Sequence, residues 1–333
     1  MYRHQTVGVK SFLLMYFANR SKLLLREKIK MRKKLLLTPY RISKSLHVRR
    51  NLVVDVVAIM DVVVDAAAVD AVVVQKIRSL RTLTLVNSNE RLDDLDRNGY
   101  KIIQNPEVFC FGIDAVLLSH FAKVTKKDQK VLDIGTGTGI IPILMHAVYQ
   151  KGKYTGIDIQ EEMVEMANRS LQLNEVTEDI QIKHVDVKDY RNHFEGHSLD
   201  LVTCNPPYMR GTNGLKNEHP SKTIARHEVM CTLEDIIEAA GYVLKVKGKL
   251  CMIHRPQRLA DIICAMRQNK IEPKRLRMVY PKPGQAPTMI LIEGVKGGNS
   301  EMRVEKPLIV YNEDGTHTDE IYEIYGREKP KAQ

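Results

Sequence analysis

The four consecutive residues Asn205-Pro206-Pro207-Tyr208 carry groups that could bind a planar amino group. Two prolines stiffen a turn and remove two backbone donors, which leaves carbonyl oxygens exposed as acceptors. The Asn205 side-chain oxygen and the Pro206 carbonyl could each accept one N–H of an exocyclic amine. The Tyr208 ring could stack on the attached base, which contributes about 1–3 kcal/mol. Because holding both hydrogens directs the nitrogen lone pair towards an electrophile, the pattern predicts a catalytic site for transfer to an amino group.

A glycine-rich segment, Asp133-Ile-Gly-Thr-Gly-Thr-Gly139, offers a site for the second reactant. Glycines let the backbone turn tightly and approach a ligand closely. Their G-x-G-x-G spacing differs from the G-x-G-x-x-G of dinucleotide-binding proteins, which hold a pyrophosphate at a helix N-terminus. Asp158, 19 residues after Gly139, could accept hydrogen bonds from two ribose hydroxyls, and Asp186 could reach an adenine amino group. Together these residues predict a nucleoside cofactor without a pyrophosphate, for which S-adenosylmethionine is the candidate.

The elements that must position these residues alternate regularly between strand and helix. Strands are predicted at Val131–Ile134, Tyr154–Asp158, Ile180–His184, Leu199–Cys204 and Lys249–His254. Helices are predicted between them at 140–149, 161–173, 232–244 and 256–269. Two further strand-like runs, Arg275–Tyr280 and Thr288–Val295, are joined by a short Pro/Gly turn, which favours an antiparallel pair. The pattern predicts an α/β fold, a Rossmann-like doubly wound seven-stranded sheet with a terminal antiparallel hairpin.

A small lead-in, residues 85–125, precedes this alternation. Two short strands, 91–95 and 101–104, are predicted around the Arg97-Asn98-Gly99 turn. An apolar helix is predicted over 113–124, with Asp114 placed to cap its first turn.

The motifs resemble those of a known family. Residues 130–208 look like a class I S-adenosylmethionine-dependent methyltransferase of the Asn-Pro-Pro-Tyr amino-methylating group. Residues 90–95, 101–104, 109–118, 225–228 and 311–318 further resemble the bacterial methyltransferases that modify N6 of adenine 37 in a valine tRNA. The likeness covers about residues 86–326, and the family's members begin near Leu85.

The resemblance implies roles for particular residues of this chain. Phe111 to Ala115 would help to close over the cofactor, and Asn205 to Tyr208 would hold the target adenine. The implied cofactor-binding residues are Phe111, Gly112, Asp114, Asp133, Gly135, Thr136, Gly137, Gly139, Asp158, Ile159, Asp186, Val187 and Asn205.

The loop after the Asn-Pro-Pro-Tyr motif is predicted to face RNA. It carries Arg210, Lys216, Lys222, Arg226 and His227, and contacts to phosphates supply affinity and position on a nucleic acid. An unpaired adenine can enter a pocket at little cost, because no duplex has to be opened. The other interpretation is an ordinary solvated loop with surface lysines.

Other classes of protein remain open. The same motif occurs in enzymes that methylate the glutamine amide of peptide release factors, and in DNA and rRNA base methyltransferases. The glutamine enzymes carry a helical N-terminal domain, which the strand-like 90–104 region does not supply. A non-catalytic RNA-binding platform would be expected to show an eroded cofactor motif, whereas no glycine or acidic position is missing here.

Residues 1–84 differ from the rest of the chain. They carry 17 Lys/Arg against 5 Asp/Glu, so most of the net charge of +11 lies before the motifs. A second local excess of positive charge lies in residues 209–303, which carry 17 Lys/Arg against 9 Asp/Glu. In Asn51–Val74, 20 of 24 residues are Val, Ala or Asp, and four aspartates exclude a membrane helix. The composition is typical of low-complexity sequence, either disordered or appended by an upstream start codon, rather than of an RNA-docking arm or a signal peptide. The methyltransferase domain is expected to span residues 85–330.

The five cysteines form no C-x-x-C pair, which argues against a disulfide framework or a zinc ribbon. His193 and His197 have a spacing that could bind a metal on a helix, but Gly196 favours a surface turn. The cysteine usage favours a reduced, cytoplasmic protein. The family resemblance implies tRNA as the partner, and we expect a monomer bound to neither a metal nor a membrane.

Overall fold

A computed structural model describes residues 85–108, 110–206 and 231–329, all within one compact unit of the chain. The predictions for residues 1–84 and for the loop 207–230 lie outside the described residues. Within the described ranges, no helix has the length and apolar character needed to cross a membrane.

The main sheet has five parallel strands followed by an antiparallel pair. β3 (Lys130–Ile134), β4 (Lys153–Asp158), β5 (Ile180–His184), β6 (Leu199–Cys204) and β7 (Leu244–His254) lie in the order β5-β4-β3-β6-β7. β9 (Met289–Lys296) is antiparallel to both β7 and β8 (Ile271–Tyr280), so the doubly wound sheet with its terminal hairpin is confirmed. Two short strands, β10 (Arg303–Val304) and β11 (Leu308–Ile309), raise the number from the predicted seven to nine by pairing with β8. Two residues are too few to show a strand periodicity in sequence.

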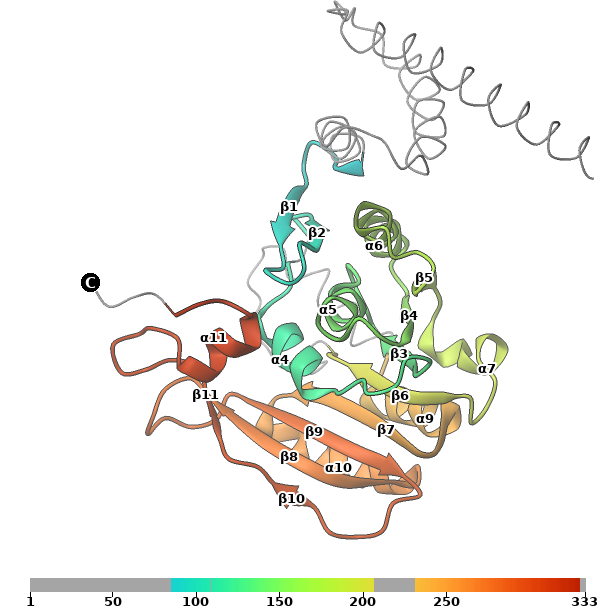
Figure 1. The fold of residues 1–333 in the computed structure, drawn as a ribbon. Coiled ribbons are helices and arrows are strands. Elements are labelled where there is room, and N and C mark those ends of the chain that lie inside the picture. Colours follow the sequence, from blue (N-terminus) through green and yellow to red (C-terminus); the bar gives the residue numbers. More distant parts are fainter. Residues whose placement is uncertain (1–84, 109, 207–230, 330–333) are drawn as a thin grey trace, which may run out of the picture. The chain divides into compact units, whose positions relative to one another are not determined.

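Helices cover both faces of the sheet (Figure 1). On one face lie α4 (Ile113–Phe121), α5 (Ile140–Tyr149) and α6 (Glu161–Asn174), and on the other lie α7 (Tyr190–His193), α9 (Leu233–Val243) and α10 (Leu259–Gln268), the last preceded by the 3-10 turn Pro256–Arg258. α11 (Asp319–Tyr325) packs on α4. Each face encloses its own apolar core, because strand side chains alternate between the two faces.

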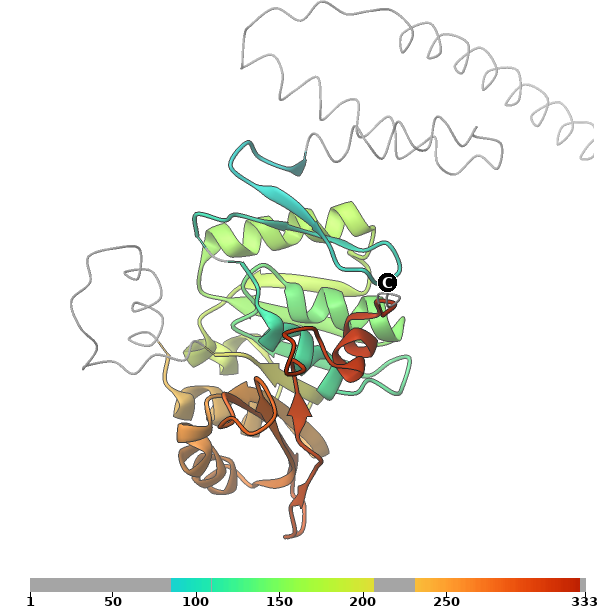
Figure 2. The same cartoon turned by 90° about the vertical axis from the view of Figure 1, so that its left-hand side faces the viewer.

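The predicted lead-in strands form a two-stranded antiparallel sheet, β1 (Arg91–Asp94) and β2 (Lys101–Gln104), which packs beside α6 (Figure 2). The side chains of α6 bind the backbone of β2: the Ser170 hydroxyl accepts from the Ile103 amide at 3.0 Å, and the Asn174 side chain accepts from the Lys101 amide at 2.8 Å. The Asn174 amide also donates to the Lys101 carbonyl at 2.6 Å. Polar groups of a helix therefore hold this strand.

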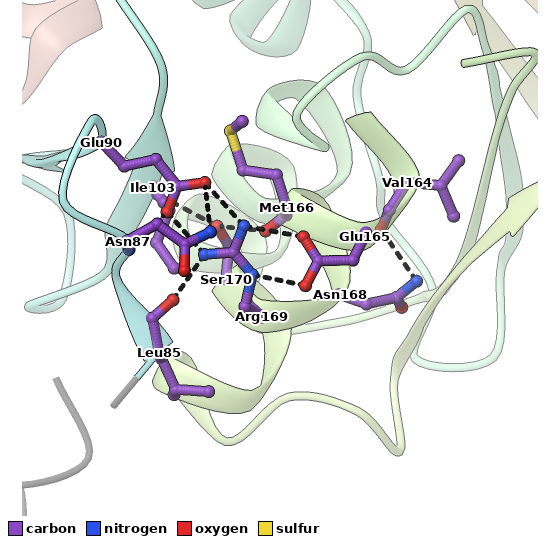
Figure 3. A network of polar contacts seen from close by, with 10 residues as sticks. All are labelled: Leu85, Asn87, Glu90, Ile103, Val164, Glu165, Met166, Asn168, Arg169 and Ser170. Atoms are coloured by element: carbon purple, nitrogen blue, oxygen red, sulfur yellow. Dashed lines mark hydrogen bonds and ion pairs between the residues drawn. The ribbon is translucent and has the colours of Figure 1, made fainter. Parts of the chain in front are cut away.

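A buried ion pair fastens the start of the domain to α6 (Figure 3). The Arg169 guanidinium donates to both carboxylate oxygens of Glu90 at 2.6 and 2.7 Å, to the Leu85 carbonyl at 2.5 Å, and to Glu165. Only 12% of the Arg169 side chain and 4% of the Glu90 side chain are exposed. A bidentate pair in this setting fixes the geometry of the entering chain.

Some predicted boundaries are wrong. α4 ends at Phe121, and its N-cap is Gly112, without a side-chain cap hydrogen bond, whereas Asp114 lies inside the first turn and accepts from the Ala115 amide at 2.9 Å. β7 begins at Leu244, five residues before the predicted start, and the register between β6 and β7 shifts near Leu199. Exposed Val246 and the positive φ of Lys247 make this part of β7 irregular, which hides it from a search for alternating patterns.

Candidate functional site

The glycine loop lies across the carboxyl end of β4. The amides of Gly135 and Thr136 both donate to the Ile157 carbonyl, at 2.9 and 3.0 Å. The Gly137 amide donates to the Asp158 carboxylate at 2.8 Å. Gly135, Gly137 and Gly139 all have positive φ, a backbone conformation that other residues adopt only with strain. The loop conformation therefore depends on the glycines and on two residues at the end of β4.

Asp158 has a structural role in addition to any contact with a ligand. One carboxylate oxygen accepts from Gly137 and the other accepts from the Gln160 amide at 2.9 Å, and only 7% of the residue is exposed. A carboxylate oxygen has two lone pairs, so the oxygen bound to Gly137 can accept one more hydrogen bond, whereas the other also accepts from the Gln160 side-chain amide at 3.5 Å. The carboxylate thus orders the loop and keeps acceptor capacity for hydroxyl donors.

Asp133 links the glycine loop to β6, the strand that ends at Asn205. The Thr203 hydroxyl donates to one Asp133 carboxylate oxygen at 2.7 Å, and the two residues are partners in the pairing of β3 with β6. Burial raises the pKa of Asp133 to about 7, although the hydrogen bond from Thr203 opposes this shift. We did not predict a role for Thr203 from the sequence. A polar residue among apolar ones in the predicted strand, two positions before Asn205, is the signal that could have found it.

Three buried polar atoms in this loop make no hydrogen bond of good geometry among the described residues, although the Thr136 hydroxyl lies near enough to the Asp133 carboxyl to lower its pKa. They are Oδ2 of Asp133 and the hydroxyl oxygens of Thr136 and Thr138. Each of these residues is at most 2% exposed. Buried polar groups are nearly always hydrogen-bonded, and the exceptions call for an explanation. A polar ligand bound against the loop would supply the missing partners.

The ends of β4 and β5 provide the other predicted contacts. Asp186 follows β5 and its side chain caps a 3-10 turn, Val187–Asp189, by accepting from the Lys188 amide at 2.9 Å. Ile159 is half-buried and Val187 is buried, so that both can offer apolar surface beside the two aspartates. The parallel strands bring Asp133, Asp158 and Asp186 to the same edge of the sheet, as the sequence predicted.

Phe111, Gly112 and Asp114 form the turn that begins α4. Phe111 packs against the core on the α4 face, and Gly112 is exposed. A Cβ atom at Gly112 would lie 2.9 Å from the Asp114 carboxylate, so the side chain of Asp114 occupies the space that the glycine leaves. The roles of these three residues in cofactor binding stay predictions.

The acceptor motif begins at the end of β6. Asn205 is half-buried and Pro206 is buried, immediately after Cys204, which pairs with Ile134 of β3. Pro207 and Tyr208 lie outside the described residues, as do Arg210, Lys216, Lys222, Arg226 and His227. The structure thus places the first half of the acceptor motif one strand away from the glycine loop.

The two histidines with metal-like spacing have other partners. His193 contacts the Asp189 carboxylate at 3.2 Å, and His197, which has a positive φ, contacts the Leu244 carbonyl at 3.0 Å. In the described part of the chain, no cluster of three His, Cys, Asp or Glu side chains has the geometry to hold a metal.

Comparisons with known proteins place this arrangement among methyltransferases. The methyltransferase small domain family model matches residues 99–268. A tRNA1(Val) (adenine(37)-N6)-methyltransferase of Parabacteroides distasonis is 28% identical over 182 residues, covering 55% of this chain and 75% of that protein. The enzyme of the same name from Proteus mirabilis is 26% identical, covering 63% and 83%. The crystal structure of a predicted O-methyltransferase from Agrobacterium tumefaciens is similar in fold, with a TM-score of 0.53 and 22% identity over 66% of this chain and all of that one.

Proposed function

The chain belongs to the methyltransferase small domain family and is an S-adenosylmethionine-dependent enzyme, and on this premise we propose that it methylates the exocyclic N6 amine of an unpaired adenine in tRNA. The observation that carries the proposal is the pairing of β3 with β6. It places Asn205 and Pro206 beside the loop that contains Asp133. The proposed acceptor groups and the glycine loop therefore lie at the same end of the parallel strands.

The residues around the glycine loop fit S-adenosylmethionine. The acceptor oxygens of Asp133 and Asp158 suit a ligand that carries an ammonium group and ribose hydroxyls, and the hydroxyls of Thr136 and Thr138 can donate or accept. Asp186, Ile159 and Val187 would border the adenine. When bound, the cofactor supplies a methyl group activated by its positively charged sulfur. The chain binds and orients the two reactants.

Asn205 and Pro206 would orient the target amine. The Asn205 side-chain oxygen and the Pro206 carbonyl would each accept one N–H, which fixes the plane of the amino group and directs its lone pair. No base has to remove a proton beforehand: the N–C bond would form as the methyl–sulfur bond breaks, and the nitrogen, then positively charged, would release its proton to water. Tyr208 would hold the base by stacking.

A tRNA substrate is supported by the relatives, whose names give adenine 37 of a valine tRNA as the target. An anticodon-loop adenine is unpaired and can reach a pocket without disruption of a duplex. The basic residues between Arg210 and His227 would contact the flanking phosphates. Such a substrate implies that the enzyme works in the cytoplasm, and the proposal is for a monomeric enzyme.

Incubation with labelled S-adenosylmethionine and either bulk tRNA or peptide release factor tests the substrate. We expect label in tRNA, recovered as N6-methyladenosine by mass spectrometry of the nucleosides. Label only in the release factor would identify a glutamine methyltransferase instead, and label in guanosine would exclude the adenine substrate. Parallel incubations with rRNA and DNA distinguish the remaining base methyltransferases.

Replacing Asn205 by alanine should abolish turnover and leave cofactor affinity nearly unchanged. Removing one preorganised group at a reacting centre typically lowers the rate by about 10²–10³. Single-turnover methyl transfer to tRNA measures the rate, and calorimetry with S-adenosylmethionine measures the affinity. A variant that methylates tRNA at nearly the wild-type rate would contradict the proposed acceptor geometry.

A further inference from the structure

The turn Phe111–Asp114 is held by a residue of the lead-in hairpin, Gln104. Gln104 is the last residue of β2 and is only 1% exposed. Its side-chain oxygen accepts from the Phe111 amide at 2.8 Å. Its side-chain nitrogen donates to the carboxylate of Asp93 on β1. Both ends of one buried amide are therefore occupied, one by the turn and the other by the hairpin.

Asp93 fixes which way the Gln104 amide points. An ionised carboxylate only accepts hydrogen bonds, so it must face the NH₂ group of Gln104, and the oxygen then faces the Phe111 amide. The Arg91 guanidinium donates to the same carboxylate at 3.0 and 3.1 Å and holds it in place. Arg91 and Gln104 are direct partners in the pairing of β1 with β2. The hairpin register thus brings all three side chains to the same face.

The held turn leads into the first turn of α4, with Gly112 as the N-cap and Asp114 inside the helix. The Asp114 carboxylate lies over Gly112, where a Cβ atom would meet it at 2.9 Å. This close fit depends on the position of the backbone just before it, which is the Phe111 amide that Gln104 binds. A shift of Phe111 would move both residues together.

We infer that Gln104 is a positioning residue for cofactor binding, which holds the Phe111–Asp114 turn through the Phe111 amide, with its orientation set by Asp93. The inference rests on the proposed contact between this turn and S-adenosylmethionine, and it is independent of the RNA substrate. Gln104 itself acts through the backbone of the turn. Its loss should therefore raise KM for S-adenosylmethionine much more than it lowers kcat.

Replacing Gln104 by leucine removes the acceptor and keeps a similar volume. We expect the affinity for S-adenosylmethionine, measured by calorimetry, to fall roughly tenfold, as for the loss of one hydrogen bond to a buried donor. Gln129 offers a matched control, since it too is a buried glutamine whose oxygen accepts backbone amides, those of Thr125 and Lys126, but it precedes β3 at the opposite edge of the sheet. Gln129→Leu should lower the thermal stability without changing the affinity.

Exchanging the amide and the carboxylate between positions 93 and 104 tests whether their hydrogen bond orients the side chain at position 104. Gln104→Glu alone sets two carboxylates against each other and should weaken cofactor binding at least as much as Gln104→Leu. The double variant Asp93→Asn/Gln104→Glu restores one donor and one acceptor, because the new amide can donate to the new carboxylate, whose second oxygen accepts from Phe111. We expect the double variant to recover an affinity within about threefold of the wild type.

Two results would overturn the inference, and a Gly112→Val variant shows which part of it fails. A folded Gln104→Leu variant with wild-type affinity would remove Gln104 from cofactor binding, and so would a double variant that binds no better than Gln104→Glu. Gly112→Val probes the turn directly, because its side chain must displace Asp114. If Gly112→Val also keeps wild-type affinity, the turn itself lies away from the cofactor. If only Gly112→Val loses affinity, the turn is part of the site and Gln104 does not position it.

Discussion

Two sets of buried charged side chains in this domain differ in how completely they are hydrogen-bonded. In the Arg169–Glu90 pair, both carboxylate oxygens and the guanidinium have partners. Burial alone would raise the pKa of Glu90, but the hydrogen bond from Arg169, the hydrogen bonds from Asn87 and the charge of Arg169 together lower it below its usual value. The hydrogen bond to Glu90 likewise raises the pKa of Arg169. Both groups are held in their charged forms.

Asp133 is in the opposite situation. It is 1% exposed, one of its oxygens makes no hydrogen bond of good geometry among the described residues, and burial raises its pKa to about 7. A buried carboxylate without sufficient partners costs stability. The difference indicates two roles. The Arg169–Glu90 pair, whose hydrogen bonds are satisfied within the protein, stabilises the fold, whereas Asp133 keeps an oxygen that a ligand can bind.

The largest effect is expected from Arg169→Ala. The change leaves the Glu90 carboxylate with only its hydrogen bonds from Asn87, and breaking a buried ion pair typically costs at most about 3–5 kcal/mol. Urea denaturation should show this decrease in the free energy of unfolding. Lys153→Ala is the control, because the Lys153–Asp179 pair is exposed, at 58% and 39%, and such pairs contribute roughly 0–1 kcal/mol. Equal losses in the two variants would contradict a special role for the buried pair.

Unlike Arg169→Ala, Asp133→Asn should weaken cofactor binding without lowering the stability of the fold. Replacing the charge by a neutral group of the same shape removes the cost of burying it, so the unliganded variant should unfold no more easily than the wild type at pH 8. The cofactor loses a charged acceptor, and hydrogen bonds to charged groups contribute about 1.5–3 kcal/mol, so its affinity should fall roughly ten- to a hundredfold. Calorimetry and urea denaturation give the two quantities. Loss of stability with unchanged affinity would place Asp133 among the structural charges.

The pH dependence of stability should identify the same carboxyl group. The folded-state pKa of Asp133, about 7, lies above the ordinary value of 3.8, so the folded state keeps a proton that the unfolded state has lost. The contribution of Asp133 is therefore complete below about pH 4 and is lost as the pH rises to about 7. The free energy of unfolding of the wild type, relative to Asp133→Asn, should decline between pH 4 and 7 and then level off. A constant difference across this range would exclude the raised pKa.

The smallest effect is expected from removal of residues 1–84. No motif depends on them, so stability and methyl transfer should stay at the wild-type level. The truncated chain must keep Leu85, because its carbonyl accepts a hydrogen bond from Arg169. Thermal unfolding and the tRNA methylation assay provide the measurements. An insoluble or inactive product would make the N-terminal segment part of the enzyme.

The alternation of elements was predictable because each strand end carries its own local signal. The helix predicted over 140–149 has the bounds of α5, because the glycine loop marks where it begins. The strands Ile180–His184 and Leu199–Cys204 also have the predicted bounds. The contact of Thr203 with Asp133 could not be predicted, because it depends on the register of strands 70 residues apart. The same is true of Arg169 and Glu90, whose pairing joins a helix to the start of the domain. Partners distant in sequence leave no local pattern.

The hydrogen bonds between α6 and β2 also bear on association between copies of the chain. A two-stranded sheet has open edges, and an open edge can pair with a strand of another molecule and start aggregation. Here Ser170 and Asn174 already occupy the Ile103 amide and both backbone groups of Lys101. The helix thus acts as a cover for that edge. Its polar side chains protect the β2 edge of the lead-in hairpin from intermolecular pairing without the need for a further strand.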